Sequence, residues 1–481
     1  MADRRDDFPD ICGEEEKILP LLKRRRQMFA PISNIPFDEI QSCFGIALHM
    51  HQPTIPAGGD NLSTAKLISN LQYMMEHQNI GDNHNAPIFL HCYSRMGEII
   101  PELVAQGCNP RVMLDYSGNL LWGLQQMGEE KVLNNLKRIT IEEKYHPYVE
   151  WLGTMWSHAV VTSTPVPDIK LHIMAWRHHF ASIFGEKAAK RVKGFSPPEM
   201  HLPIHPDVCF EYVRALKECG YQWLMVQEHT IENIDGSSIR KPHFPHRLIA
   251  KNSLGKTEEI TILIKTQGSD TKLVAQMQPY YEAKCIGREN YGGKKEIPPF
   301  VLQIGDGENG GVMMNEFPFA YKKVFQEIGK GAVVGMNGSE YLEFIKRAGV
   351  EEKSFIPVQP VLQHRIWKNL KGYYPGAADE AIEKIQKEDA AFNLEKASWT
   401  NDKSWVKGYE DVLNPINKLS VAFHKKFDGK RINKKRPEYK KALVYLLLSQ
   451  TSCFRYWGKG IWTEYAKEIC RRGQECLSSK K

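Results

Sequence analysis

Two carboxyl side chains in this 481-residue sequence stand where a pair could act as nucleophile and general acid/base. Glu199 ends the run GFSPPE, and Asp306 lies in the run QIGDGENGG. The prolines before Glu199 restrict the backbone and favour a rigidly held carboxylate, but a glutamate after proline is also common at a helix N-terminus. The glycines around Asp306 allow a sharp turn and the approach of a ligand, and they are equally typical of an ordinary loop. Local sequence leaves both interpretations open for each residue.

Histidines form a second set of candidate site residues. His49 and His51 are two residues apart, so in a strand both side chains point to the same face. Such a pair, joined by His158, can bind sugar hydroxyls or a metal ion. Zinc requires three or more convergent ligands, and Asp115 or His91 could supply the rest. A sugar-binding site and a metal site therefore both remain open.

Three of the tryptophans are candidates for stacking on a sugar ring. Trp156 and Trp223 lie near the expected ends of strands, and Trp457 lies in a helical part of the sequence. An indole ring offers a large flat apolar face, although most buried tryptophans are simply core residues. We therefore predict substrate contacts at these three positions only.

Apolar segments of strand length alternate with longer helical segments from residue 43 onward, which is typical of parallel βα units. The expected strands are 43–50, 86–93, 111–117, 150–157, 192–196, 221–227, 299–305 and, as a closing or exit strand, 331–337. Seven or eight such units predict an α/β barrel. Reactive side chains of a barrel project from the carboxyl ends of its strands, where most of the candidate residues stand.

The chain divides into three expected parts. Residues 1–38 lack a clear period and form an N-terminal arm, which we expect to be peripheral. Residues 39–345 form the barrel, with an insertion at about 228–298 that we expect over its mouth. Residues 346–481 carry helical periodicity and predict a C-terminal helical domain packed against the barrel.

The composition favours a globular protein and argues against several classes of function. The net charge of +7 is small for this length and its basic clusters contain few aromatics, so we expect no nucleic-acid partner. The run GDGENGG fits neither glycine motif that cradles phosphates. No apolar stretch approaches the roughly 18 to 20 residues that span a bilayer, and the N-terminus is too polar for a secretory signal. We expect a cytoplasmic protein without a membrane partner, whose scattered cysteines are mostly buried thiols, and the oligomeric state stays open.

The ordered set of motifs resembles glycoside hydrolase family 57. The set comprises HMHQP at 49–53, His158, PPE ending at Glu199, DGE starting at Asp306 and SQTSCFRYWG at 449–458. The resemblance covers about residues 43–460. It implies a distorted or incomplete (β/α)7 barrel followed by a C-terminal helical bundle, as in α-amylases, 4-α-glucanotransferases and branching enzymes. It further implies a retaining mechanism on α-glucans that needs neither a metal nor a cofactor.

The resemblance also assigns roles to the candidate residues. Glu199 falls on the nucleophile and Asp306 on the general acid/base, while the substrate contacts fall on His49, His51, His158 and Trp457. A retaining pair is expected to have its carboxyl groups about 5 to 5.5 Å apart. Glu199 should then be ionised and Asp306 protonated at the working pH.

Three positions depart from the family pattern: Pro197 before the nucleophile, Gly310 after DGE, and a glycine instead of a histidine after Trp457. These departures affect the expected acceptor side, so hydrolysis and transfer to a sugar both remain open. Two further interpretations stay open as well. One is a metal-dependent polysaccharide deacetylase or α-mannosidase-like enzyme, and the other is a catalytically silent glucan-binding homologue.

Overall fold

The central strand of the sheet, β1 (Ser42–Met50), has the sequence SCFGIALHM and is buried along almost its whole length. The structure is a computed structural model that describes residues 8–23, 26–266, 271–292, 295–308, 315–328, 331–400, 403–430 and 432–478. Burial on both faces is typical of parallel strands, and β1 pairs in parallel with β4 (Val112–Tyr116) and β13 (Phe300–Asp306). The register sets His49 opposite both Asp115 and Asp306, so three candidate residues lie in one row.

The parallel pairings run in a circuit. β1 pairs β4, which pairs β5 (Val149–Trp151), and Gly153 just after β5 forms an isolated bridge with β6 (Gly194–Phe195). β6 pairs β7 (Trp223–Gln227), β7 pairs β10 (Thr257–Lys265), and β10 returns to β13. A further short strand, β14 (Val333–Gly335), pairs the beginning of β1. The predicted α/β class with a parallel sheet is confirmed.

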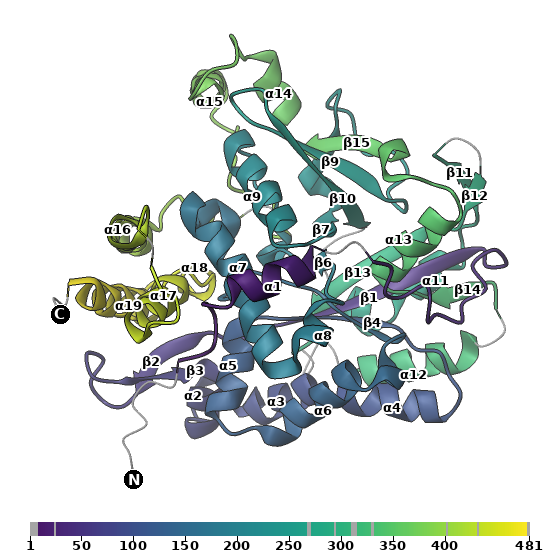
Figure 1. Cartoon of the computed structure of the whole chain (residues 1–481), viewed down its shortest axis with the longest axis horizontal. Helices are drawn as coiled ribbons and strands as arrows, with labels where there is room; N and C mark the ends of the chain where they lie inside the picture. Colours follow the sequence, from purple (N-terminus) through teal and green to yellow (C-terminus); the bar gives the residue numbers. More distant parts are fainter. Residues whose placement is uncertain are drawn as a thin grey trace.

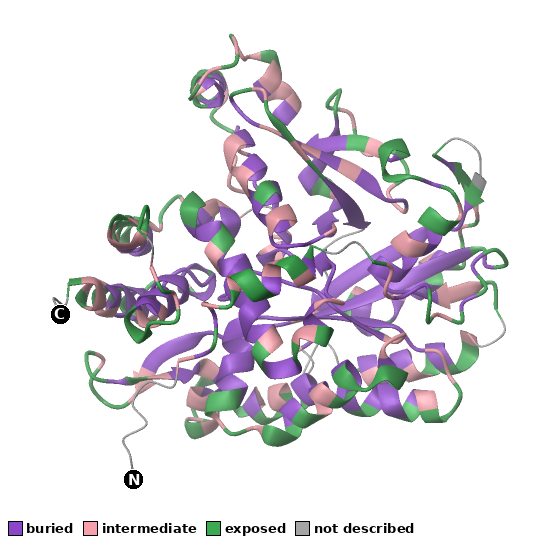
Figure 2. Ribbon diagram, viewed as in Figure 1, coloured by how far each residue is buried: buried purple, intermediate pink, exposed green. Residues whose placement is uncertain are grey.

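Helices connect the strands and pack outside the sheet, with buried residues on their inner faces (Figures 1 and 2). In α9 (Pro206–Glu218), for example, Cys209, Val213 and Leu216 recur at three- and four-residue spacing and are buried. The other helices of this region are α2 (Asn70–Glu76), α3 (Ala86–Ser94), α4 (Met96–Ala105), α5 (Gly118–Gln126), α6 (Glu130–Ile141), α7 (Val166–Phe184), α8 (Glu186–Ala189), α10 (Lys272–Ala275), α11 (Gln278–Ala283), α12 (Phe317–Glu327) and α13 (Gly338–Arg347). Two small hairpins, β2 (Thr54–Gly58) with β3 (Lys66–Ser69) and β11 (Glu289–Tyr291) with β12 (Lys295–Ile297), lie outside the main sheet.

The strand predicted at 86–93 is wrong, because this segment forms helix α3. Pro87 occupies the first turn of the helix, where a missing N–H costs no hydrogen bond. Burial follows a helical pattern, with Ala86, Cys92 and Tyr93 inside and Ile88 exposed. A short apolar run does not by itself distinguish a strand from a helix.

The predicted insertion at 228–298 contributes to the main sheet. Its strand β10 lies between β7 and β13, and it also pairs antiparallel with β9 (His246–Lys251). β9 continues the sheet through β15 (Ile356–Pro360) to β8 (Ile231–Asn233). Strand structure therefore extends beyond residue 345, and β10 is an integral strand, because its ITILIK segment is buried like the strands beside it.

After β15 the chain is helical, as predicted. It forms α14 (Gln363–Lys368), α15 (Ala377–Glu388), α16 (Glu410–Phe427), α17 (Pro437–Leu448), α18 (Cys453–Tyr456) and α19 (Ile461–Ser478). Helices α16, α17 and α19 contact one another and lie to one side of the sheet (Figure 1). The buried carboxylate of Asp168 in α7 accepts hydrogen bonds from His424 and Gln450, each at 2.7 Å. These bonds fix the position of the C-terminal helices relative to the strand region.

The N-terminal arm is packed onto the rest of the chain instead of being peripheral. Its helix α1 (Glu15–Leu22) buries Ile18 and Leu22. The carboxylate of Glu343 accepts hydrogen bonds from the backbone N–H groups of residues 28–30, at 2.7 to 2.9 Å. Six cysteines are buried, in line with the prediction for most of them. Among the helices described, none is long and apolar enough to cross a bilayer.

Candidate active site

His49 lies at the centre of the row of residues at the strand ends. Its Nδ1 donates to Asp115 Oδ2 over 2.9 Å. Burial by itself would lower the pKa of His49, but the charge and hydrogen bond of Asp115, together with the charges of Asp306 and Glu308, raise it to about 10. His49 is therefore a partly buried imidazolium ion at neutral pH.

His51 and His158 stack beside it as neutral rings. The ring centroids of His51 and His158 are 4.3 Å apart, and those of His49 and His158 are 4.7 Å apart. Burial and neighbouring positive charge hold the pKa of both His51 and His158 well below the usual range. Ser117 Oγ and Ser452 Oγ lie 2.7 Å from the Nδ1 atoms of His51 and His158, respectively. Ser452 follows α17, so the C-terminal helices complete the site.

Glu199 follows β6 in a short turn of 3-10 helix and adopts a left-handed backbone, with φ of 57° and ψ of 20°. His158 also has a positive φ, of 59°. Such conformations cost energy for residues other than glycine and concentrate at functional sites. The backbone N–H of Trp399 donates a hydrogen bond to the backbone oxygen of Glu199 over 2.9 Å and helps to hold the turn. The stiffness expected from Pro197 and Pro198 is thus accompanied by backbone strain at the carboxylate itself.

The carboxyl groups of this site are coupled. Burial and the charge of Asp306 raise the pKa of Glu199 to about 7. Burial also raises the pKa of Asp306, against the opposing charge of His49. A third carboxyl group, that of Glu308, accepts a hydrogen bond from the backbone N–H of His51 over 3.0 Å. Burial and the charge of Asp306 raise the pKa of Glu308 to about 8.

The glycines on either side of Asp306 serve packing. A Cβ on Gly307 would lie 2.1 Å from Cε of Met50, and one on Gly305 would press on Val274 at 3.2 Å. These close contacts bring β13 and the loop after it onto the neighbouring elements. Gly310 and Gly311 lie outside the described residues.

A cavity of about 670 Å³ joins the predicted site residues. Its lining includes Glu199, Asp306, His49, His51, His158 and Trp457, which come from β1, from β13, from segments after β5 and β6, and from the C-terminal helices. The structure therefore gathers six of the eight predicted site residues at one place. Trp457 is 58% exposed, as a sugar-stacking residue must be before substrate binds.

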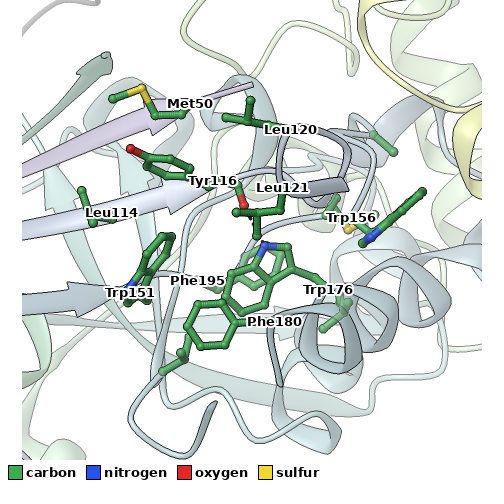
Figure 3. Packing of buried hydrophobic residues seen from close by; sticks show 14 of the residues in the cluster. Met50, Leu114, Tyr116, Leu120, Leu121, Trp151, Trp156, Trp176, Phe180 and Phe195 are labelled. Carbon is green, nitrogen blue, oxygen red and sulfur yellow. Dashed lines mark hydrogen bonds between the residues drawn. The ribbon is translucent and has the colours of Figure 1, made fainter. Parts of the chain in front are cut away.

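Trp156 and Trp223 do not line this cavity, so the prediction of sugar stacking is wrong for both. Trp156 is fully buried among other hydrophobic side chains (Figure 3). Its Nε1 donates to His179 Nδ1 over 3.2 Å. Trp223 is 1% exposed, and its Nε1 donates to Ser339 over 2.9 Å. Both indole rings are core residues with satisfied N–H groups.

Several lining residues had no clear signal in the sequence. They are Trp399, Tyr456, Trp462 and Tyr465 among the aromatics, and Asn70, Asp82, Asn83 and Asn85 among the polar residues. Trp462 and Tyr465 are three apart on α19 and share a face, but helical spacing of aromatics is more often a core pattern. His91, considered as a metal ligand, is exposed on α3. In the part of the chain that is described, no three His, Cys, Asp or Glu side chains are grouped so that they could hold a metal ion.

The fold of the chain is similar to that of several solved structures. A 4-α-glucanotransferase from Thermococcus litoralis has a TM-score of 0.53 and 16% identity, over 91% of this chain and 60% of the other. A GH57-type branching enzyme from Pyrococcus horikoshii has a TM-score of 0.51 and 13% identity, over 90% of this chain and 87% of the other. The chain has the fold of glycoside hydrolase family 57. The similarity predicted from the motifs is thus confirmed at the level of the fold.

An α-amylase from Thermotoga maritima also has this fold, with a TM-score of 0.52 and 10% identity over 91% of this chain and 93% of that enzyme. The chain spans about three fifths of the length of the glucanotransferase. No protein-family model matches the sequence, and no curated protein matches it either.

The raised pKa of Glu308 predicts a pH-dependent effect on stability. The folded chain retains a proton up to about pH 8 that the unfolded chain releases near pH 4.5, so this group lowers the free energy of unfolding as the pH rises between these values. The Glu308→Gln substitution keeps an acceptor for the backbone N–H of His51 and removes the titratable carboxyl group. We expect the variant to equal the wild type in urea denaturation at pH 4.5 and to exceed it by about 1 kcal/mol or more at pH 8. A difference that is the same at both pH values would contradict this assignment.

Proposed function

We propose that the protein is a retaining glycoside hydrolase or glucanotransferase that acts on α-glucans. The observation that carries the proposal is that Glu199 and Asp306 line one cavity at the carboxyl ends of parallel strands, beside the His49 imidazolium. The similar structures include a glucanotransferase, a branching enzyme and an α-amylase. Within this proposal, the circuit of seven strands corresponds to an incomplete (β/α)7 barrel, and α16 to α19 correspond to the C-terminal helical bundle.

In the proposed mechanism, Glu199 attacks the anomeric carbon and forms a glycosyl ester. The glycosidic C–O bond breaks, and the proton of Asp306 passes to the departing oxygen. In the second step Asp306 takes a proton from water or from a sugar hydroxyl, whose oxygen displaces Glu199. The choice between water and sugar decides between hydrolysis and transfer. This mechanism requires the two carboxyl groups to lie about 5 to 5.5 Å apart when the substrate is bound.

The two carboxyl groups need one proton between them. Burial and the charge of Asp306 raise the pKa of Glu199, while His49, Lys403 and Arg455 act in the opposite direction. The proposed roles require the proton to lie on Asp306 when the glucan is bound. When the glycosidic oxygen accepts a hydrogen bond from protonated Asp306, it stabilises the neutral form of that carboxyl group. The hydrogen bond therefore raises the pKa of Asp306 and favours the proton on Asp306 instead of Glu199.

The three histidines have distinct roles in this proposal. The His49 imidazolium, held by Asp115, supplies positive charge next to Asp306 and a donor to the sugar. His51 and His158 remain neutral, so they can each donate to or accept from a hydroxyl group. Polar groups that contact the sugar at the reacting bond contribute most when they tighten in the oxocarbenium-like transition state.

Product analysis with maltooligosaccharides tests the proposal. We expect the purified chain to convert maltoheptaose into shorter chains, or into both shorter and longer chains if it transfers. Activity that survives extensive treatment with chelator would separate this enzyme from a metal-dependent deacetylase or mannosidase. Absence of any product from maltooligosaccharides and longer α-glucans would overturn the proposed activity.

A further inference from the structure

One wall of the cavity is an aromatic surface that the two catalytic carboxyl groups do not require. It consists of Tyr456, Trp457, Trp462 and Tyr465, which lie on α18, directly after it, or on α19. The rings of Trp457 and Trp462 are nearly parallel, at 24° with centroids 6.1 Å apart, and Tyr465 meets Trp462 edge-on at 5.8 Å. Tyr456 and Trp457 are 45% and 58% exposed, Trp462 is partly exposed and Tyr465 is only 8% exposed, so the wall reaches from the solvent into the protein.

Another part of the lining is polar and comes from a different segment of the chain. Asp82, Asn83 and Asn85 lie on the single 3-10 turn at Gly81–Asn85, and all three are at least partly exposed. Asn70 and Tyr73 of α2 also line the cavity. Aromatic faces combined with amide and carboxylate groups match a sugar, which has apolar ring faces and a rim of hydroxyls.

The cavity extends from the proposed reaction centre to α19. Glu199 and Asp306 stand at the ends of the strands β6 and β13, whereas Trp462 and Tyr465 lie on α19, which contacts the hairpin strand β2. Both groups of residues line the same cavity of about 670 Å³. A cavity of this size holds a ligand of several rings. The aromatic wall is therefore placed to contact a sugar unit other than the one at the cleaved bond.

We infer that Trp462 and Tyr465, together with the turn at Gly81–Asn85, form a sugar subsite remote from the cleaved bond, and that this subsite makes the enzyme select longer α-glucan chains. This inference rests on the proposed function. A glucosyl unit stacked on Trp462 contacts no reacting group, so it adds binding energy only for chains long enough to reach it. Short substrates that occupy only the reaction centre gain nothing from it.

Binding without turnover provides the test. In a Glu199→Gln background, we expect Trp462→Ala to weaken maltoheptaose by about tenfold or more in isothermal titration calorimetry, and to change maltose binding by less than about twofold. Tyr465→Phe keeps the ring and is expected to retain most of the affinity for maltoheptaose. Trp367→Ala is the matched control, because Trp367 is partly exposed on α14 under Lys251 and does not line the cavity.

The outcomes separate the subsite from the activity. Equal loss of affinity for maltose and maltoheptaose in Trp462→Ala, or no loss for either, would overturn the subsite, provided that urea denaturation shows the variant folded. If Trp462→Ala does not fold, Asn83→Ala gives the same comparison from a partly exposed residue of the polar part of the lining. Failure of the proposed function alone would appear differently, as chain-length-dependent binding in the wild type without any product.

Discussion

Replacing Glu199 by glutamine is expected to reduce turnover of α-glucans by about 10⁴-fold or more, the scale seen when a nucleophile is removed. Glutamine has nearly the shape of glutamate but cannot form the glycosyl ester. The change also removes a carboxyl group whose pKa is raised to about 7 by burial and Asp306, so it relieves an electrostatic cost in the folded chain. We therefore expect lost activity without lost stability. Reducing-sugar release and urea denaturation measure the two effects.

The control for this variant is Glu228→Gln. Glu228 directly follows β7, is partly exposed and has a raised pKa due to burial, but it does not line the cavity. It should keep wild-type turnover within a few fold. A smaller variant, Glu199→Ala, should regain activity when azide is added, and the product should then be a glycosyl azide of inverted configuration at the anomeric carbon. Wild-type turnover in Glu199→Gln would show that Glu199 is not the nucleophile.

Replacing Asp306 by asparagine is expected to slow cleavage of maltooligosaccharides by roughly 10² to 10⁴-fold, the usual contribution of a general acid/base. Asparagine cannot protonate the departing oxygen, which matters when that oxygen belongs to a sugar and leaves as a poor leaving group. An aryl glucoside with nitrophenol as leaving group does not need this proton. The variant should therefore form the glycosyl enzyme from it at nearly the wild-type rate, measured as a burst of nitrophenol.

This comparison also tests which carboxyl group has which role. Burial raises the pKa of both Glu199 and Asp306, and the charge of Asp306 raises that of Glu199 further, which fits either assignment of the two roles. A burst of nitrophenol in Asp306→Asn, together with azide rescue of Glu199→Ala, would support the proposed roles. Azide rescue of an Asp306→Ala variant that gives a glycosyl azide of inverted configuration, with a leaving-group effect in Glu199→Gln, would reverse them, whereas an azide product of retained configuration is the result expected if Asp306 is the general acid/base.

The strands around the site could be predicted because the signal for each of them lies within a short segment of the sequence. SCFGIALHM in β1 and PFVLQIG in β13 are continuous apolar runs, which are typical of parallel strands buried on both faces. Because side chains at carboxyl strand ends gather at one edge of such a sheet, His49 and Asp306 could be placed together from sequence. The register of β1 with β13 sets these two residues directly opposite each other.

The errors arose where the local pattern was ambiguous. The run APIFLHCY has too few residues to show whether its apolar residues recur with a helical or a strand period, and packing selects helix α3. Trp156 and Trp457 look alike in sequence as large aromatics near predicted site residues. Only their surroundings distinguish them, since Trp156 packs beneath α5 against Gly118 while Trp457 stands open at the cavity.

The sequence by itself predicted the parallel α/β architecture through short-range apolar periodicity, and it predicted the pair of carboxyl groups and the histidines at the end of β1 through the ordered set of motifs. The tertiary structure decided what depends on contacts between distant segments. It set the partner of His49, the coupling of Glu199 to Asp306, and the cavity that residues of α18 and α19 line together with residues 70–85. Charge coupling and cavity shape arise only when the chain has folded, since both depend on distances between residues far apart in the sequence.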